Sequence, residues 1–300
     1  MNTHPFRSEQ VKSEYLQHYQ SVLDLWPTPY EEKDINTSYG TTHVRINGPI
    51  DAPPLFLFHG AGTCSLQWLL NIEELSKHFR TYAMDGVINL GCVGRSVPSQ
   101  PILDESNAVQ WVDELLDGLN VHTAINLVGS SYGGWLASHY TLKRQDNIRK
   151  LLLIAPAGTL SPFNGSYSFK SLLIHFFPFH RVYQWYFKWV FKNLYKNDID
   201  FFDKVIKDFI LSSKSFIPIN PSQLPKIKPL TDNELISLTK SVKIIMGDSD
   251  VVYSPMDTSK RVRTLNSAIE IEELENTGHD LLLTHTDYIN ASMVSYFQND

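Results

Sequence analysis

The stretch NLVGSSYGG, residues 126–134, places small residues on both sides of Ser131. A side chain that points from the end of a buried strand into a cleft must sit on a sharp, strained strand-to-helix turn. Its neighbours two before and two after must be small, or they collide with the adjacent strand and helix. Gly129 and Gly133 meet that demand, with strand-like INLV before and helix-like WLASHYTLKR after. This context predicts a nucleophile turn at Ser131 rather than a chance glycine-rich loop.

Short apolar runs alternate with longer mixed segments along most of the chain. Strands are predicted at 39–46 (in a meander), 55–58, 80–84, 124–128, 150–154, 242–246 and 269–274, and helices at 65–77, 108–119, 135–144 and 288–297. Strands that alternate with helices of this size indicate right-handed crossovers and a mostly parallel sheet. With 300 residues, 42% of them hydrophobic, the chain can bury a sizeable core. We therefore expect an α/β fold with a mostly parallel central sheet flanked by helices.

The pattern changes between Ala157 and about Lys240, where the chain becomes helical, aromatic-rich and proline-rich, without a clear buried strand. Ligands of open α/β sheets bind outside the carboxyl ends of the strands, so helices inserted there would enclose a pocket. We predict a core formed by residues 1–156 and 241–300, and a helical cap, or lid, formed by residues 157–240.

A serine hydroxyl is a poor nucleophile near neutral pH, so Ser131 needs a base and a third group that orients the base. The order expected on this kind of fold is serine, acid, histidine. Asp248 and Asp250 follow the strand VKIIM, and His279 follows the strand IEIEEL. We predict His279 as the base. Asp250 is the preferred acid, because in related sequences the acid commonly stands three residues after the glycine, here Gly247. Asp248 stays open as the alternative acid, although its side chain could instead cap the turn.

The reaction also needs donors for the negative charge that develops on the substrate oxygen. We expect one from the backbone N–H of Tyr132, at the start of its helix, and one from Ala61 in the loop His59-Gly60-Ala61-Gly62. Losing one such donor typically costs about 10²–10³-fold in rate. His59 has no metal-like partner spacing, so we interpret it as a structural residue that shapes the loop. The loop also lacks the third glycine of a dinucleotide-binding fingerprint.

Composition argues against several other classes of function. The formal net charge is −6 without a long basic run, so no nucleic acid partner is expected. Cys64 and Cys92 have neither disulfide-framework nor metal spacing and are expected to be reduced thiols. The first 20 residues show neither the basic start nor the apolar core of a signal peptide, so export by the general route is not expected. Residues 171–195 are interrupted by Pro178 and carry three basic side chains, so no integral membrane segment is predicted. We expect a soluble, cytoplasmic protein.

Together these motifs resemble the α/β-hydrolase family and, within it, the bacterial carboxylesterases of the naproxen-esterase type (carboxylesterase NP). The resemblance covers most of the chain and includes LWP (25–27), GPIDAPPLFLFHGA (48–61), RTYAMD (80–85), GSSYGG (129–134), IAPAGTLSPF (154–163), TDNEL (231–235) and MGDSDVVYSP (246–255). It implies the α/β-hydrolase fold with the helical cap inserted after the sixth strand. It also implies a small-molecule ester as substrate, cleaved without a metal or an organic cofactor.

The resemblance supports Ser131, His279 and Asp250 in the roles given above. The family often has a glutamate at the position of Asp250, so the shorter aspartate would have to lie slightly closer to His279. The segment 165–225 matches least clearly, and since the cap usually sets substrate choice, the substrate stays open.

Three functions are compatible with these residues. The first is a serine carboxylesterase that works through an acyl-enzyme. The alternatives are a C–C bond hydrolase or lyase on the same triad, and a non-catalytic member of the fold that binds a small molecule. Because binding proteins of this fold often lose a triad member and this chain loses none, catalysis is favoured. Epoxide hydrolases and haloalkane dehalogenases use an aspartate nucleophile, which Ser131 argues against.

The cap has two interpretations. Lys188, Lys192 and Lys196 recur four residues apart, with Arg181 earlier and many aromatic residues between them. This pattern predicts either an amphipathic lid that contacts lipid surfaces or a cap whose aromatic residues pack on a dry pocket while its lysines face water. We favour the second interpretation and leave a weak contact with a lipid surface open.

Overall fold

Alternating apolar side chains explain why the central strands form a sheet that is covered on both faces. In β3 (Pro54–Phe58), Phe56 and Phe58 belong to one buried apolar cluster, whereas Leu55 and Leu57 belong to another. Successive side chains of a strand point to opposite faces of a sheet, so two clusters require helices on both sides. The computed structural model describes residues 5–88, 92–177, 179–217 and 220–299.

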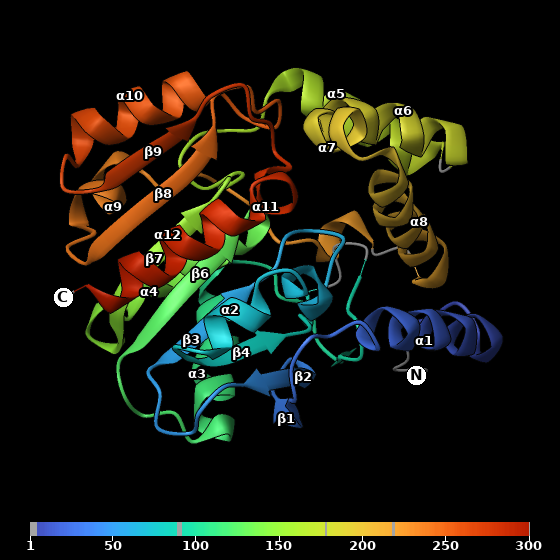
Figure 1. Ribbon diagram of the computed structural model, residues 1–300, viewed down its shortest axis with the longest axis horizontal. Coiled ribbons are helices and arrows are strands. Elements are labelled where there is room, and N and C mark those ends of the chain that lie inside the picture. Colours follow the sequence, from blue (N-terminus) through green and yellow to red (C-terminus); the bar gives the residue numbers. More distant parts are fainter. Residues whose placement is uncertain (1–4, 89–91, 178, 218–219, 300) are drawn as a thin grey trace.

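The sheet has the spatial order β1-β2-β4-β3-β6-β7-β8-β9 (Figure 1). Its strands are β1 (Glu31–Thr37), β2 (Gly40–Asn47), β3, β4 (Arg80–Met84), β6 (Ile125–Ser130), β7 (Ile148–Ile154), β8 (Ser241–Gly247) and β9 (Glu270–Leu274), while the two-residue β5 (Val97–Pro98) pairs with β2. The strands from β4 to β9 along this order pair with one another in parallel, whereas β2 pairs antiparallel with each of its partners, β1, β4 and β5. The prediction of a mostly parallel sheet flanked by helices is therefore confirmed.

Helices cover the two faces of the sheet. One face carries α3 (Glu105–Leu119), α4 (Tyr132–Lys143) and α10 (Pro255–Leu265), whose buried residues belong to the same cluster as Phe56. The opposite face carries α2 (Ile72–Ser76), which follows a 3₁₀ turn at Ser65–Trp68, and α12 (Thr286–Gln298), which follows α11 (Leu281–Thr284). A further 3₁₀ turn, Gln145–Asn147, leads from α4 into β7.

The segment 157–240, predicted as the cap, follows β7, which is the sixth strand when the short β5 is set aside. It contains α5 (Gly165–Phe176), α6 (His180–Val190), α7 (Lys192–Asn197), α8 (Ile199–Ser215), a 3₁₀ turn at Pro221–Gln223 and α9 (Asp232–Ser237). Figure 1 shows α5 to α8 gathered beyond one end of the sheet. Since β7 and β8 are paired neighbours, this segment leaves the sheet after one strand and returns to it at the next.

Two elements near the N-terminus differ from the sequence-based expectation. The helix α1 (Glu9–Leu23) was not predicted, although Ser8 caps it and its buried side chains Tyr15, Tyr19 and Leu23 recur every four residues. The edge strand β1 was not predicted either, because only Ile35 of its seven residues is buried and the strand is stabilised by its ladder with β2. The helix predicted over 65–77 divides into the 3₁₀ turn and the short α2.

A buried carboxylate ties these N-terminal elements to the sheet. The Asp85 side chain accepts hydrogen bonds from Ser65 N–H, Arg95 N–H and the Tyr19 hydroxyl, at 2.9, 2.7 and 2.9 Å. Burial alone raises the pKa of a carboxyl, but the nearby His43 and Arg45 and these donors outweigh burial and hold the pKa of Asp85 below its ordinary value.

Asp85→Asn is expected to lower the free energy of unfolding by about 2–4 kcal/mol, because an amide cannot accept all three hydrogen bonds and removes the charge that faces Arg45. A carboxyl with a depressed pKa contributes stability above its unfolded pKa of about 3.9 and loses it as the pH falls. The stability of Asp85→Asn should therefore depend less steeply on pH in the acid range. Urea unfolding between neutral and acid pH measures both effects.

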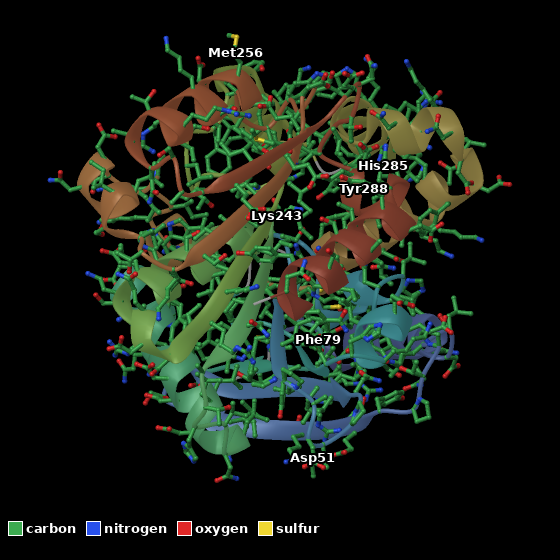
Figure 2. All side chains as sticks on the ribbon, turned by 60° about the vertical axis from the view of Figure 1, so that its left-hand side comes forward. Asp51, Phe79, Lys243, Met256, His285 and Tyr288 are labelled. Atoms are coloured by element: carbon green, nitrogen blue, oxygen red, sulfur yellow. The ribbon has the colours of Figure 1, made fainter. Side chains whose placement is uncertain are left out.

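Asp51→Asn is the matched control, since Asp51 is exposed at a loop on the surface (Figure 2). It should change the free energy of unfolding by less than about 0.5 kcal/mol. Equal effects of the two substitutions would contradict the role given to Asp85.

Candidate active site

Ser131 occupies a strained turn between β6 and α4. Its backbone has φ 51° and ψ −117°, a conformation that residues other than glycine rarely adopt. Three backbone hydrogen bonds hold it there: Ser131 N–H donates to Ile154 at 2.9 Å, and the Ser131 carbonyl accepts from Gly134 and Ala157 at 2.9 and 3.2 Å. Packing around the turn thus holds the Ser131 side chain at the end of β6.

The glycines on either side of Ser131 are required by close backbone contacts. A Cβ atom on Gly129 would lie 2.4 Å from the Gly133 carbonyl oxygen, and one on Gly133 would lie 2.2 Å from the Phe58 carbonyl oxygen. These contacts join β6 to the first turn of α4, and that turn to the end of β3. They are the steric reason for small residues that the sequence pattern predicted.

His279 and Asp250 lie in the loops that follow β9 and β8. The Nε2 atom of His279 is 2.9 Å from Ser131 Oγ, and its Nδ1 atom is 2.7 Å from Asp250 Oδ2. The Asp250 side chain is fully buried, and its second oxygen accepts from Val252 N–H at 2.8 Å. An ionised carboxylate only accepts hydrogen bonds, so Nδ1 donates to Asp250 and leaves Nε2 to accept the Ser131 hydroxyl proton.

The alternative acid, Asp248, lies outside this arrangement. Its side chain is exposed and accepts a hydrogen bond from the Ser249 hydroxyl at 2.8 Å. The two loops are packed backbone to backbone, since Ser249 N–H donates to Thr277 at 3.0 Å and a Cβ atom on Gly247 would lie 2.1 Å from the Thr277 carbonyl oxygen. This packing directs Asp250, and not Asp248, toward His279.

The loop that carries Ala61 and the first residue of α4, Tyr132, both adjoin Ser131: a Cβ atom on Gly60 would lie 3.3 Å from Ser131 Cβ. Tyr132 is the first residue of α4, and Ala61 lines the same cavity as Ser131 and His279. Gly60 N–H donates to Gln67 Oε1 at 2.9 Å, and the Thr63 hydroxyl donates to the same atom at 2.7 Å, so Gln67 fixes the shape of the loop. Within the described residues, neither the Ala61 nor the Tyr132 amide donates to a protein acceptor.

His59 is held in one neutral form by two backbone groups. Its Nε2 accepts from Gly86 N–H at 3.1 Å, so Nδ1 carries the proton and donates to the Gly60 carbonyl at 2.8 Å. Burial lowers the pKa of His59, which keeps the ring uncharged. These contacts support the interpretation of His59 as a residue that shapes the loop. In the described part of the chain, no group of His, Cys, Asp or Glu side chains is arranged to hold a metal ion.

A cavity of about 430 Å³ extends from Ser131 and His279 toward α1 and α8. Its wall is largely apolar and includes Val22, Leu25, Leu66, Leu69, Leu70, Phe191, Phe201, Val205, Phe209, Leu282 and Leu283. The two helices contact each other at one side, where His18 Nε2 lies 2.5 Å from Asp208 Oδ1. Sequence reasoning missed this wall because it did not recognise α1. The four-residue spacing of Tyr15, Tyr19 and Leu23 was the available signal.

Sequence reasoning also missed Asp280, which connects the loop of His279 to the cap. Its Oδ2 atom accepts from Leu194 N–H, in α7, at 2.6 Å, and burial raises the pKa of its carboxyl. The Asn193 side chain donates to the Asn276 carbonyl at 2.7 Å in the same region. Two polar contacts therefore fix α7 against the loop that carries the histidine.

Comparisons with known proteins agree with this arrangement. A family model described as the alpha/beta hydrolase family matches residues 55–291. Two proteins of Bacillus subtilis (strain 168) are each 28% identical over 94% of this chain: "Uncharacterized carboxylesterase nap", of which 92% is covered, and "Carboxylesterase YbfK", of which 93% is covered. The crystal structure of naproxen esterase (carboxylesterase NP) from Bacillus subtilis is similar with a TM-score of 0.86 and 26% identity, covering 97% of this chain and 100% of that chain.

Gly133→Ala is expected to destabilise the protein by about 1–3 kcal/mol or more, because the added methyl group cannot fit against the Phe58 carbonyl. Gly165→Ala is the matched control, since a Cβ atom there meets nothing within 4 Å, and it should change stability by less than about 0.5 kcal/mol. Thermal or urea unfolding of both variants measures the difference. Equal stability of the two would show that the turn at Ser131 tolerates a larger residue.

Proposed function

The chain belongs to the alpha/beta hydrolase family, and from this premise we propose that it is a carboxylesterase that uses Ser131 as its nucleophile. The observation that carries the proposal is the series of hydrogen bonds from Ser131 through His279 to Asp250, at 2.9 and 2.7 Å. The full-length similarity to proteins named carboxylesterase and naproxen esterase supports an ester as the substrate. The resemblance to this family that the sequence motifs indicated is confirmed.

In the first half of the proposed reaction, His279 Nε2 takes the hydroxyl proton of Ser131 as Oγ attacks the ester carbonyl carbon. The carbonyl π electrons move to oxygen, and the Ala61 and Tyr132 amides stabilise that negative charge. When the tetrahedral intermediate collapses, the C–O bond to the alcohol breaks and His279 gives its proton to the leaving oxygen. The products are a free alcohol and an acyl group bound to Ser131.

In the second half, water replaces the alcohol and the steps repeat. His279 removes a proton from water, the hydroxide attacks the acyl carbon, and the Ser131–acyl bond breaks with return of the proton to Oγ. Asp250 stays ionised throughout, holds the tautomer of His279 and stabilises the imidazolium that forms in each half. Its buried position and its hydrogen bond from Val252 fix that orientation.

We assign residues 157–240 to a cap over a core formed by residues 1–156 and 241–300. Within the cap, α8 supplies one wall of the cavity and α7 contacts the loop of His279. An apolar cavity of about 430 Å³ fits esters with an apolar group of considerable size. The cap would therefore select substrates while the core supplies the reacting groups.

Wild-type protein is expected to hydrolyse p-nitrophenyl esters from acetate to longer acyl chains, and Ser131→Ala should lose about 10⁴-fold or more in kcat. Release of p-nitrophenol measures the rates, and unfolding curves verify that the variant is folded. Inactivity of folded wild-type protein on every ester would favour a binding protein. Turnover of a meta-cleavage diketone without any ester turnover would favour a C–C bond hydrolase instead.

Asp250→Asn should lower kcat by about 10⁴-fold, because an amide no longer holds His279 in the tautomer that accepts the Ser131 proton. Asp248→Asn removes a carboxylate only two residues away and is the matched control, expected to retain activity within a few-fold. The same ester assay compares them. A larger loss in Asp248→Asn than in Asp250→Asn would reverse the assignment of the acid.

A further inference from the structure

The helices α5 and α6 expose a group of large apolar side chains. Phe169, Leu172, Phe177, Phe179 and Trp185, called the apolar patch here, are each between 45% and 65% exposed. Phe169 and Leu172 are three residues apart on α5, Phe177 and Phe179 lie where the chain passes from α5 to α6, and Trp185 is on α6. A gathering of this kind on a monomer usually marks a surface that contacts a partner or a membrane.

The side chains of the apolar patch are exposed although α6 also packs a separate set of aromatic side chains against the rest of the protein. The opposite side of α6 buries Tyr183, Tyr186 and Phe187, and the Phe187 ring packs on Phe209 of α8 at 4.5 Å between centroids. The aromatic residues of the cap thus divide into a packed set, as the favoured sequence interpretation expected, and the exposed apolar patch. Helix α6 has already satisfied its contacts with the core, so the apolar patch is a second apolar surface.

Along the sequence, the segment that carries the apolar patch holds only positive charges, and the first carboxylates after it are Asp198 and Asp200 at the start of α8. Residues 165–197 contain Lys170, Arg181, Lys188, Lys192 and Lys196 and no Asp or Glu, in a chain whose formal net charge is −6. Across the part of the chain that the structure describes, none of these five forms an ion pair with a carboxylate. The ammonium group of Lys170 lies 3.5 Å from the centre of the Trp189 ring, beside the apolar patch. The other four side chains are exposed, and the ammonium group of Lys188 lies 4.5 Å from the centre of the Tyr195 ring, so their charge faces solvent.

We propose that α5, α6 and their connection dock on the surface of an anionic lipid bilayer. Aromatic and leucine side chains enter the interface between headgroups and acyl chains, and lysine and arginine side chains reach the anionic headgroups. The contact would be superficial, since no helix among the described residues has the length and apolar character to cross a bilayer.

A second copy of the chain fits this surface less well than a bilayer does. In a two-fold symmetric dimer the same surface faces itself, so the Lys and Arg side chains of α5 and α6 would oppose each other, and neither helix carries a carboxylate. Like charges placed opposite each other across an interface are strongly unfavourable. An anionic bilayer instead matches both the apolar and the charged side chains.

The location of the surface makes docking compatible with access to the cavity. Figure 1 shows α5 and α6 at the outer edge of the molecule, away from β1. Through the contact of Phe187 with Phe209, α6 adjoins α8, which forms part of the cavity wall. Docking would therefore bring the cavity close to molecules dissolved in the bilayer.

The experiment is co-sedimentation of the full-length protein with vesicles of phosphatidylglycerol and, separately, of phosphatidylcholine. We expect binding to phosphatidylglycerol vesicles that weakens as salt concentration rises, because exposed charges are screened, and much weaker binding to phosphatidylcholine. The readout does not require enzyme activity, so its result is independent of the proposed esterase function.

Two double variants test the apolar and the charged parts. Phe177→Ser/Phe179→Ser and Arg181→Glu/Lys188→Glu should each lower partitioning onto phosphatidylglycerol vesicles by about tenfold or more. Ile50→Ser/Ile236→Ser is the apolar control, because both side chains are exposed and lie outside α5 and α6, Ile50 in the loop between β2 and β3 and Ile236 on α9. Lys33→Glu/Lys260→Glu controls for net charge. Both controls should bind as wild type does, and thermal unfolding verifies that all four variants fold.

Several results would overturn the proposal. The proposal is wrong if wild-type protein stays in the supernatant when it is sedimented with phosphatidylglycerol vesicles at low salt. Loss of binding in the controls equal to that in the test variants would show that the contact is not at α5 and α6. The surface would instead be a contact between copies of the chain if wild-type protein forms a dimer in solution, does not bind vesicles, and becomes monomeric in Phe177→Ser/Phe179→Ser.

Discussion

The close approach of three backbone segments around Ser131 is the constraint on which the rest of the site depends. Gly129, Gly133 and the Phe58 carbonyl are so near one another that no side chain fits between them. That contact fixes α4 against β3 and β6, and it leaves Ser131 in a conformation that the turn alone would not favour. The Tyr132 amide and the loop of Ala61 then lie beside the same hydroxyl, because both adjoin the segments that meet there.

A second close backbone contact positions the two side chains that are hydrogen-bonded in series to Ser131. The loops after β8 and β9 share backbone contacts through Gly247 and Thr277, and these loops carry Asp250 and His279. Because β8 and β9 are parallel neighbours, their loops emerge at the same edge of the sheet as the turn after β6. Parallel strands thus deliver three side chains from distant parts of the chain to one place.

The cap and the N-terminal segment surround this rigid site with a different kind of structure. Phe6 and Phe216 pair at the end of α8, and His18 contacts Asp208, so the first helix of the chain and the longest helix of the cap form one wall of the cavity. That wall is apolar inside, whereas α5 and α6 carry apolar and positive side chains outside. Ser131, Asp250 and His279 thus come from the segments before and after residues 157–240, while that segment contributes cavity wall and exposed surface.

The sequence by itself determined the features that depend on neighbouring residues. The alternation of strands and helices and the turn at Ser131 with its two glycines follow from periodicity and backbone sterics. Only the tertiary structure decided the features that depend on contacts between distant segments. It directed Asp250 rather than Asp248 toward His279, paired β1 with β2, joined α1 to α8, and separated the packed from the exposed aromatic residues of the cap. Local patterns cannot settle these choices, because each is made by the partner that a side chain meets after the chain has folded.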